Sequence, residues 1–403
     1  MTATRSSPIF DAAKALLPEM IAVRRRLHRR PEIGLRLPES QAIVVEELTR
    51  LGLTPTLGRE TTSVTTTIDG ADEGRTILLR ADMDALPLVE ETGLEFASEF
   101  DGVMHACGHD THVAMLLGAA RLLSDRRSTF AGRVVLMFQP GEEGYHGARV
   151  MLEEGLLDIA GEEPPTAAFA LHISTLYPSG TINIRSGPVL AAADTLRITV
   201  RGRGGHASAP YLGVDPIAAA AALIGALQVM VTRRIDVFDP AVVTIAHVTA
   251  GTTNNIIPET TELEGTIRTF SDATRTLVHG EIRRVAEGIA TAHGTSIDVE
   301  IVPGYPVTEN AASMVELVRE TALDLLGPEG VAEMRAPLMG AEDFSYILER
   351  LPGAFAFLGA RPPAVDPATA PINHSNRVVF DESAMAVGAG IHTALALRYL
   401  AAP

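Results

Sequence analysis

The spacing of hydrophobic positions divides the chain into helix-like and strand-like segments. Apolar residues that recur every three or four positions predict helices with one buried face at 9–30, 38–51 and 111–123. Short continuous apolar runs predict strands buried on both faces at 75–80, 133–138 and 167–171. This alternation indicates an α/β sheet, in which functional side chains gather at the carboxyl ends of strands.

A different pattern begins after Pro188. Leu196, Ile198 and Val200 alternate with polar residues, as in a strand with one exposed face. The elements that follow are a helix at 216–231, strands at 241–248 and 262–269, a Ser271-capped helix to 293, and a strand at 296–302. The order β-α-β-β-α-β is typical of a ferredoxin-like unit.

The first pattern resumes near the C-terminus, with a helix at 312–326, a strand at 354–358 and a helix at 383–400. We therefore expect a discontinuous α/β domain with a mixed sheet, residues 1–188 and 303–403, and an inserted ferredoxin-like domain, residues 189–302. A length of 403 residues with 46% hydrophobic content also favours two domains.

Charge and composition exclude some classes of protein. A formal net charge of −17 argues against nucleic acid or an anionic membrane as partner, because both require a basic face. A single cysteine excludes an internal disulfide, and the first eight residues lack an apolar signal core, so a cytoplasmic location is expected. Apolar stretches such as 218–231 fall short of the roughly 20 residues that span a bilayer.

Cys107 and His109 form the first candidate metal-binding pair. A thiolate and an imidazole two residues apart on a glycine-containing loop can reach one metal ion. The alternative is a buried cysteine beside a surface histidine, and these two residues alone do not decide between the readings.

Glu142 and Glu143 directly follow a predicted buried strand. Adjacent carboxylates at a sheet edge can divide their roles, one binding metal and the other acting as general base. A solvated acidic turn is the alternative. Asp82 and Asp84 follow another such strand, where they can orient ligands or cap a turn. His172 and His374 are each ambiguous alone, since a lone histidine is more often a core residue than a ligand.

Seven ordered motifs together resemble the M20 metallopeptidase and amidohydrolase family. The resemblance is to its branch of N-acyl-amino-acid amidohydrolases, which includes hippurate hydrolases and hydrolases of auxin–amino-acid conjugates. The motifs are Arg80-Ala-Asp-Met-Asp-Ala-Leu-Pro87, Met104-His-Ala-Cys-Gly-His-Asp110, Gln139-Pro-Gly-Glu-Glu-Gly144, Gly204-Gly-His-Ala-Ser208, Asn255-Ile-Ile-Pro-Glu259, Met339-Gly-Ala-Glu-Asp-Phe344 and Asn373-His-Ser375.

The resemblance implies a zinc-peptidase-like catalytic domain with an inserted lid and dimerisation domain. It implies hydrolysis of N-acyl-L-amino acids by an enzyme with two divalent ions per subunit. These ions would be Mn²⁺ or Zn²⁺, and Co²⁺ or Ni²⁺ would also suit the ligands. Glu142 would be the general base and Asp84 the orienting carboxylate. The metal ligands that the resemblance implies are Cys107, His109, Glu143, His172 and His374.

The inserted domain would supply further residues of the site. By resemblance, His206 stabilises the oxyanion, often in the neighbouring subunit of a homodimer. Asn255 and Arg268 would hold the substrate carboxylate, and Gly340 would lie in a substrate-facing loop. The resemblance leaves open which acyl group and amino acid are cleaved.

Other functions remain open at this stage. A dipeptidase or carboxypeptidase of the same family would use the same residues. Cys107 could instead be the nucleophile of a cysteine amidase, although that reading leaves the two glutamates and His172 unexplained. A non-catalytic metal-binding protein would need no spare carboxylate beside Glu143.

Overall fold

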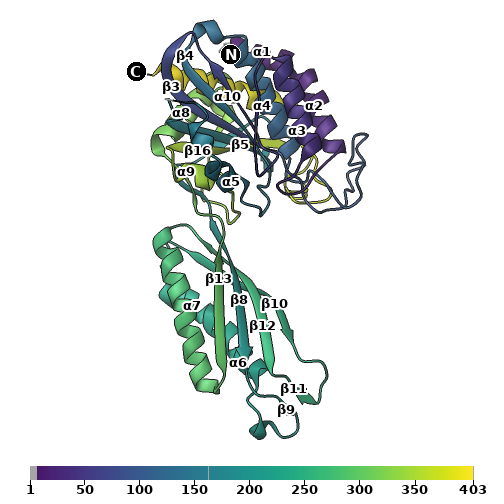
Figure 1. The fold of residues 1–403 in the computed structure, drawn as a ribbon, viewed down its shortest axis with the longest axis vertical. Helices are drawn as coiled ribbons and strands as arrows, with labels where there is room; N and C mark the ends of the chain where they lie inside the picture. Colours follow the sequence, from purple (N-terminus) through teal and green to yellow (C-terminus); the bar gives the residue numbers. More distant parts are fainter. Residues whose placement is uncertain (1–6, 162, 403) are drawn as a thin grey trace. The chain divides into compact units, whose positions relative to one another are not determined.

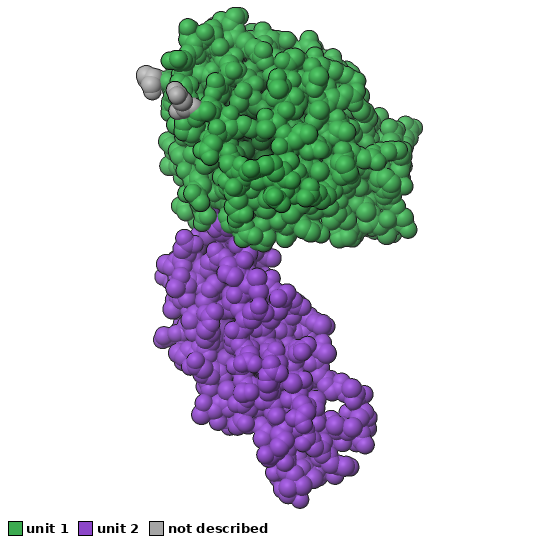
Figure 2. Space-filling model, in the orientation of Figure 1, with its two compact units in different colours: residues 1–189, 309–336, 343–403 green, residues 190–308, 337–342 purple. Residues whose placement is uncertain are grey.

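The computed structural model describes residues 7–161 and 163–402 (Figure 1). Residues 1–6, on which the expected absence of a signal segment partly rests, lie outside this range. The chain forms two compact units, coloured separately in Figure 2: unit 1 comprises 1–189, 309–336 and 343–403, and unit 2 comprises 190–308 and 337–342. Residues 303–308 and 337–342 thus belong to unit 2, beyond the insertion expected at 189–302.

Unit 1 is built on a mixed eight-stranded sheet. Its strand order is β1 (Thr56–Leu57), β2 (Val64–Asp69), β4 (Ala131–Gln139), β3 (Asp72–Asp82), β5 (Ala167–Pro178), β16 (Gly353–Arg361), β6 (Ile182–Ile184) and β15 (Val331–Glu333). β4, β3, β5 and β16 run parallel, while β2 and β6 pair antiparallel to their central neighbours. The predicted mixed α/β sheet is confirmed.

The helices of unit 1 pack on this sheet and on one another (Figure 1). They are α1 (Pro8–Ala15), α2 (Leu17–Arg29), α3 (Pro38–Arg50), α4 (His109–Ser124), α5 (Gly147–Glu153), α8 (Ala312–Leu326), α9 (Ser345–Leu348) and α10 (Ala384–Ala401). The single helix expected at 9–30 is two helices, which divide at Leu16, two residues before Pro18. Short 3₁₀ turns occur at 127–129, 156–158, 210–212 and 328–330.

Unit 2 has the ferredoxin-like order that the sequence predicts. Its strands and helices are β8 (Ala192–Arg201), α6 (Pro216–Arg234), β10 (Ala241–Ala250), β12 (Thr260–Thr269), α7 (Asp272–His293) and β13 (Ser296–Pro303). The strands form an antiparallel sheet in the order β10-β12-β8-β13. A two-stranded ribbon, β9 (Gly205–His206) with β11 (Ile256–Ile257), extends from it. The short strands β7 (Gly187–Leu190) and β14 (Thr308–Asn310) lie where the chain passes between units.

The alternation of buried and exposed side chains explains how the sheet of unit 2 packs against its helices. Leu196, Ile198 and Val200 alternate along β8 and are buried, and they share a core with Leu223 of α6 and Ile282 of α7. Asp215 caps α6 through its carboxylate, which accepts from Ile217 N at 2.8 Å. One face of the sheet is therefore covered by the two helices.

Two helices are long and apolar enough to qualify as membrane spans by length and composition, which corrects the expectation that no stretch reaches that length. They are α6, with 19 residues, and α10, with 18. In α10, 78% of the apolar window is buried within the protein. α6 buries one face, including Ala219, Leu223 and Leu227, in the core of unit 2. The same length and composition are found in core helices of folded domains.

Candidate metal centre

The candidate metal ligands of unit 1 lie close together at one edge of its sheet. The strands β3 and β4 end at this edge, and β5 continues past it. Asp82 is the last residue of β3 and pairs with Gln139, the last residue of β4. β5 continues to Pro178, so His172 lies inside this strand. The strand expected at 167–171 would have placed His172 just past its end. Because Arg80 pairs with Ala170, His172 is nevertheless level with Asp82.

A tight turn brings Cys107 and His109 to this edge. Gly108 between them has φ +89°, a left-handed conformation that glycine adopts without strain. A Cβ at this position would also lie 2.5 Å from Ile173 Cγ2. Glycine is therefore required for the loop to lie against β5 while α4 begins at His109. Both Cys107 and His109 are buried.

Two histidines flank the Cys107 sulfur. His172 Nε2 and His374 Nε2 each lie 3.3 Å from Sγ. His172 Nδ1 donates to the Ile173 carbonyl at 2.7 Å, which leaves Nε2 as the lone-pair nitrogen facing the centre. His374 belongs to an exposed loop, has a positive φ of 70°, and also approaches Glu143 Oε1 at 3.3 Å.

Asp84 fixes the turn that carries the two glutamates. Its carboxylate oxygens accept from Glu142 N and Glu143 N, each at 3.0 Å. Asp84 also approaches His109 Nδ1 at 3.4 Å, and the carboxylate is fully buried. Asp84, two residues beyond the end of β3, thus fixes the backbone from which both glutamate side chains project.

A network of buried polar side chains lies beside the candidate metal ligands. Asp82 pairs with Arg80 and with His112 Nδ1, each at 2.5 Å. His112 Nε2 accepts from Ile173 N at 2.8 Å, so its proton is on Nδ1 and it positions Asp82. Burial lowers the pKa of His112, consistent with this neutral ring.

Asp343 is a member of the network that the sequence reasoning missed. Its carboxylate accepts from Gln139 Nε2 at 2.7 Å and from Ala148 N at 2.9 Å, and it pairs with Arg80 at 3.2 Å. Its own amide donates to Glu142 Oε1 at 3.4 Å. The motif at 339–344 contained this residue, but only the fold places it beside the glutamate turn.

The donor set fits divalent metal ions. Groups of three side chains place one donor atom each within 4.8 Å of one another: Cys107 with His109 and His172, Cys107 with Glu143 and His374, and His109 with Glu142 and Glu143. The ring of His109 is fully buried, and neither of its nitrogens has a partner with hydrogen-bond geometry among the described residues; the Asp84 and Asp82 carboxylates lie 3.4 and 3.6 Å away. Buried nitrogens without a well-formed hydrogen bond are available to a ligand, and thiolate, imidazole and carboxylate suit divalent ions.

Electrostatics around these donors follow from burial and mutual pairing. Burial opposes a charged His109 ring, but the nearby Asp82, Cys107 and Asp84 groups together outweigh it and raise the pKa of His109 well above its usual value. Hydrogen bonds with Cys107 and Glu143 raise the pKa of His374 to about 10. Burial, together with the nearby Glu143 charge, raises the pKa of the Cys107 thiol.

Unit 2 carries the remaining candidate residues at two separate places. His206 in β9 and the exposed Asn255 are neighbours, since Ala207 N donates to the Asn255 carbonyl at 3.0 Å. Arg268 lies near the other end of β12, opposite Ala193. The eight residue-to-residue steps from 260 to 268 span about 26 Å, so one small ligand cannot touch both places in one unit. Gly340 is exposed and accepts from Ala191 N at 2.9 Å, at the Arg268 end.

His206 and Arg268 have local geometry suited to ligands. Ser208 N donates to His206 Nδ1 at 3.1 Å, so the neutral ring carries its proton on the outward Nε2. The Arg268 guanidinium is half-buried, and burial lowers its pKa. It forms no ion pair within the described part of the chain.

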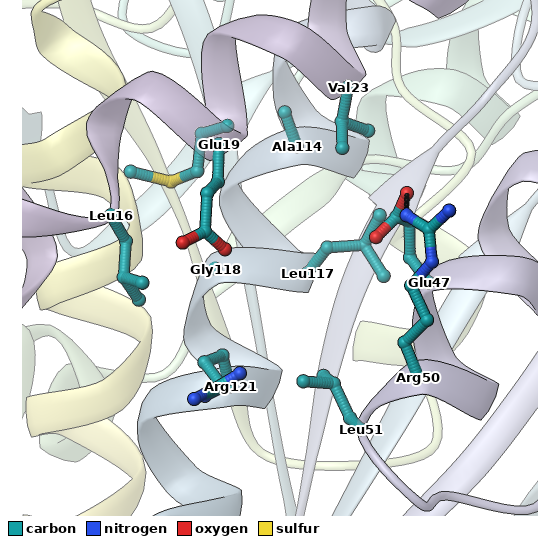
Figure 3. A pocket seen from close by; sticks show the side chains of 11 residues that line it. Leu16, Glu19, Val23, Glu47, Arg50, Leu51, Ala114, Leu117, Gly118 and Arg121 are labelled. Carbon is teal, nitrogen blue, oxygen red and sulfur yellow. Dashed lines mark hydrogen bonds and ion pairs between the residues drawn. The ribbon is translucent and has the colours of Figure 1, made fainter.

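A cavity of about 170 Å³ lies away from these donors, on unit 1 (Figure 3). Leu16, Met20, Leu117 and Gly118 form its apolar lining, and Glu19 and Arg121 stand among its charged residues. Gly118 is nine residues beyond His109 on α4, about 13 Å along the helix. None of its lining residues belongs to the ligand set.

Comparison with known proteins agrees with this geometry. Residues 78–398 match the sequence model of peptidase family M20/M25/M40. The chain is 38% identical over 387 residues to "Thermostable carboxypeptidase 1" of Saccharolobus solfataricus, covering 94% of this chain and 95% of the relative. It is 40% identical over 352 residues to "N-acetylcysteine deacetylase" of Bacillus subtilis, covering 86% and 90%.

A solved structure extends the likeness to the whole fold. The Bacillus subtilis YXEP protein, described as a dinuclear metal-binding peptidase from the M20 family, superposes with a TM-score of 0.83 at 35% identity, covering 96% of this chain and 99% of its own. The family match spans most of the chain, including every candidate ligand. The chain therefore belongs to peptidase family M20/M25/M40 and is a metal-dependent hydrolase of amide bonds.

Proposed function

We propose that the protein hydrolyses N-acyl-L-amino acids at the amide bond, giving a carboxylic acid and a free amino acid. The observation that carries this proposal is the Glu142–Glu143 turn, held by Asp84 against the cluster of Cys107, His109 and the flanking histidines. A general base beside a ligand set is the arrangement that metal-assisted hydrolysis needs. The relative named as an N-acetylcysteine deacetylase supports the substrate class.

Five side chains would hold two divalent ions in each subunit: Cys107, His109, Glu143, His172 and His374. When bound, the ions would polarise the amide carbonyl and make water a stronger nucleophile. Mn²⁺ or Zn²⁺ fits this donor set, and Co²⁺ or Ni²⁺ is compatible with it. Burial of Cys107 and His109 keeps bulk water from competing for the donors.

Glu142 is assigned the proton transfers. Its carboxylate takes a proton from the attacking water and returns it to the amine nitrogen as the amide bond breaks. Asp343 N, at 3.4 Å from Oε1, holds one oxygen of the carboxylate in place. Asp84 acts through the backbone, because it orients the turn and does not reach the substrate.

Residues of unit 2 complete the site. His206, with its Nε2 proton directed outward by Ser208, donates to the oxyanion that forms at the former carbonyl. Arg268 binds the substrate carboxylate from one subunit, because a half-buried guanidinium without an ion-pair partner suits a planar anion. Asn255 assists from beside His206, and the Gly340 loop lies at the Arg268 end.

The separation within unit 2 supports a proposed homodimer. Since about 26 Å divides His206 and Asn255 from Arg268, one small substrate can meet both sets only if they come from different subunits. The inserted domain is therefore proposed as the dimer interface, with His206 serving the partner's site. We further propose a soluble cytoplasmic enzyme that binds neither nucleic acid nor membrane, consistent with the net charge of −17.

A second activity has one specific observation in its favour. The relative named as a thermostable carboxypeptidase is 38% identical over nearly the whole chain. A peptide bond before a C-terminal amino acid presents the same amide and carboxylate, so a carboxypeptidase or dipeptidase reading shares every residue role. A non-catalytic metal-binding paralogue is the remaining alternative.

The test measures release of free amino acid from a panel of N-acetyl, N-benzoyl and N-indole-acetyl amino acids and dipeptides. Metal-stripped protein would be assayed with and without Mn²⁺ or Zn²⁺. Metal-dependent release from the N-acyl compounds is the expected result. Release from dipeptides alone would favour the peptidase activity, and no release by folded, metal-loaded protein would favour the non-catalytic alternative.

A further inference from the structure

His374 reaches the candidate metal centre from an exposed and strained position. It lies in the loop between β16 and α10, and its side chain is 56% exposed. Its φ of +70° falls in the left-handed region, which residues other than glycine rarely adopt. Such a backbone conformation persists only where the surrounding contacts determine it. The position of this proposed ligand therefore depends on the residues that hold its loop.

The side-chain amide of Asn373 makes contacts of this kind. Its Nδ2 donates to the Cys107 carbonyl at 3.1 Å and to the Ile173 carbonyl at 2.9 Å. Its Oδ1 accepts from Thr175 N at 3.4 Å. Because an amide NH₂ has two protons and both of these neighbours are carbonyl oxygens, the orientation of the amide is fixed and both of its donors are used.

The two carbonyls belong to segments that carry other proposed metal ligands. One is the carbonyl of Cys107 itself. The other, on Ile173, also accepts from His172 Nδ1 at 2.7 Å, so the His172 ring and the Asn373 amide bind the same oxygen atom. A carbonyl oxygen has two lone pairs and can accept both hydrogen bonds. Asn373 therefore connects the loop of His374 to the cysteine loop and to β5.

Further hydrogen bonds hold the loop on either side of the Asn373 side chain. His374 N donates to the Ala106 carbonyl at 2.9 Å. Thr175 Oγ1 donates to the Pro371 carbonyl at 2.8 Å, and Thr175 is itself buried. The chain before and after Asn373 is thus joined to the same two segments that its amide contacts.

We propose that Asn373 is a positioning residue, which holds the strained backbone of His374 so that its imidazole faces the metal centre before an ion binds. In this position His374 Nε2 lies 3.3 Å from Cys107 Sγ and 3.3 Å from Glu143 Oε1. Asn373 acts through His374 and is not itself a ligand. The inference rests on the ligand set of the proposed function. A ligand that is already in place loses less conformational freedom on binding, so removal of the Asn373 amide weakens metal binding.

The test measures Zn²⁺ binding by the metal-stripped full-length protein in competition with a chromophoric chelator. H374A identifies the ion concerned, because it weakens the binding step in which His374 takes part. We expect N373A to weaken this step about 10- to 100-fold, as is typical when the partner that orients a ligand is removed. N373S keeps one donor and should lose about 3- to 10-fold. N376A, which removes another amide from the same loop, is the control and should bind Zn²⁺ as wild type does.

A double-mutant cycle separates positioning from general stabilisation of the fold. In the H374A background, N373A should change the remaining Zn²⁺ binding by less than about twofold, because the residue through which Asn373 acts is absent. A Zn²⁺ affinity of N373A within about twofold of wild type would overturn the inference, as would equal losses in the two backgrounds. If N373A does not fold, N373S in the same cycle is judged by the same criteria.

The proposed function can fail separately from this inference. Zn²⁺ binding by H374A with wild-type affinity would remove His374 from the ligand set, and the inference with it. A metal-loaded wild-type protein that releases no amino acid would overturn the proposed hydrolysis of N-acyl amino acids, whereas the Zn²⁺ affinities would still decide the role of Asn373.

Discussion

The two oxygens of the Asp84 carboxylate accept from two consecutive backbone amides, Glu142 N and Glu143 N, at 3.0 Å each. Asp84 follows β3 and the glutamates follow β4, so a single buried side chain joins the ends of two parallel strands. The backbone that carries the proposed base and the neighbouring proposed ligand is therefore held by one residue that is itself buried from solvent.

We expect the D84N substitution to lower kcat about 10- to 100-fold, as is typical when the partner that orients a ligand is removed. The amide NH₂ cannot accept from a backbone N–H, which leaves one buried donor unpaired at a cost of about 1–3 kcal/mol. Steady-state kinetics and metal analysis would measure the effect. D72N, an exposed change on the same strand, is the control, and wild-type turnover in D84N would refute the positioning role.

The E142Q variant separates catalysis from metal binding. Glutamine keeps the size of the side chain but cannot take a proton, so kcat should fall by about 10²- to 10⁴-fold. Metal content, measured by elemental analysis, should remain that of wild type. E143Q provides the comparison, because it should lose metal as well as activity. An active E142Q enzyme would mean that another group is the base.

Replacement of Cys107 decides between metal ligation and nucleophilic catalysis. Serine lacks the soft sulfur donor that lies between His172 and His374, so C107S should lose both bound metal and activity. Elemental analysis after dialysis, with the release assay, would measure both. A C107S protein that kept its metal and lost only turnover would favour a cysteine nucleophile.

His206 should affect the chemical step more than substrate binding. Loss of an oxyanion donor typically costs about 10²- to 10³-fold in kcat, so H206A should lower kcat with little change in KM. S208A should have a much smaller effect, because the Ser208 backbone amide still donates to Nδ1 at 3.1 Å. H247A, an exposed histidine of the same unit, is the control. A raised KM at unchanged kcat would assign His206 to binding instead.

The local pattern of the sequence predicted most elements, because burial imposes a periodicity that is visible without the fold. The helix at 312–326 and the Ser271-capped helix to 293 agree with α8 and α7 as observed. β2 was missed, because its row of threonines reads as polar although four of its six residues are buried. Tertiary packing, and not local hydrophobicity, therefore determines that these residues form a strand.

The site was predictable only as far as its motifs extend. Asp343 binds Gln139 and Ala148 across 204 and 195 positions of the chain, and no local pattern announces such a contact. The role of His112 was not predicted either, since it depends on the Ile173 amide of another strand. The positive φ of His374 likewise has no signal in the sequence.

Asp194 provides a pH-dependent test of unit 2. Its buried carboxylate accepts from His279 Nε2 at 2.6 Å, from Arg275 Nε at 3.0 Å and from Gly304 N at 3.1 Å. Burial opposes the charged form, but these hydrogen bonds outweigh it and hold the pKa of Asp194 below its ordinary value. The carboxylate thus joins β8, α7 and the end of β13.

Because the folded pKa is lower than the value of about 3.9 in an unfolded chain, this stabilisation is complete above that pH and is lost as pH falls toward the folded pKa. Chemical unfolding at pH 7 should show D194N to be less stable by about 3–5 kcal/mol, since Arg275 loses a buried partner. As pH falls below about 4, wild type should lose stability more steeply than D194N. Hydrogen exchange of unit 2 amides would assign the change to this unit, with D298N, at an exposed ion pair of the same sheet, as control. Parallel pH profiles for wild type and D194N would show that Asp194 is not the titrating group.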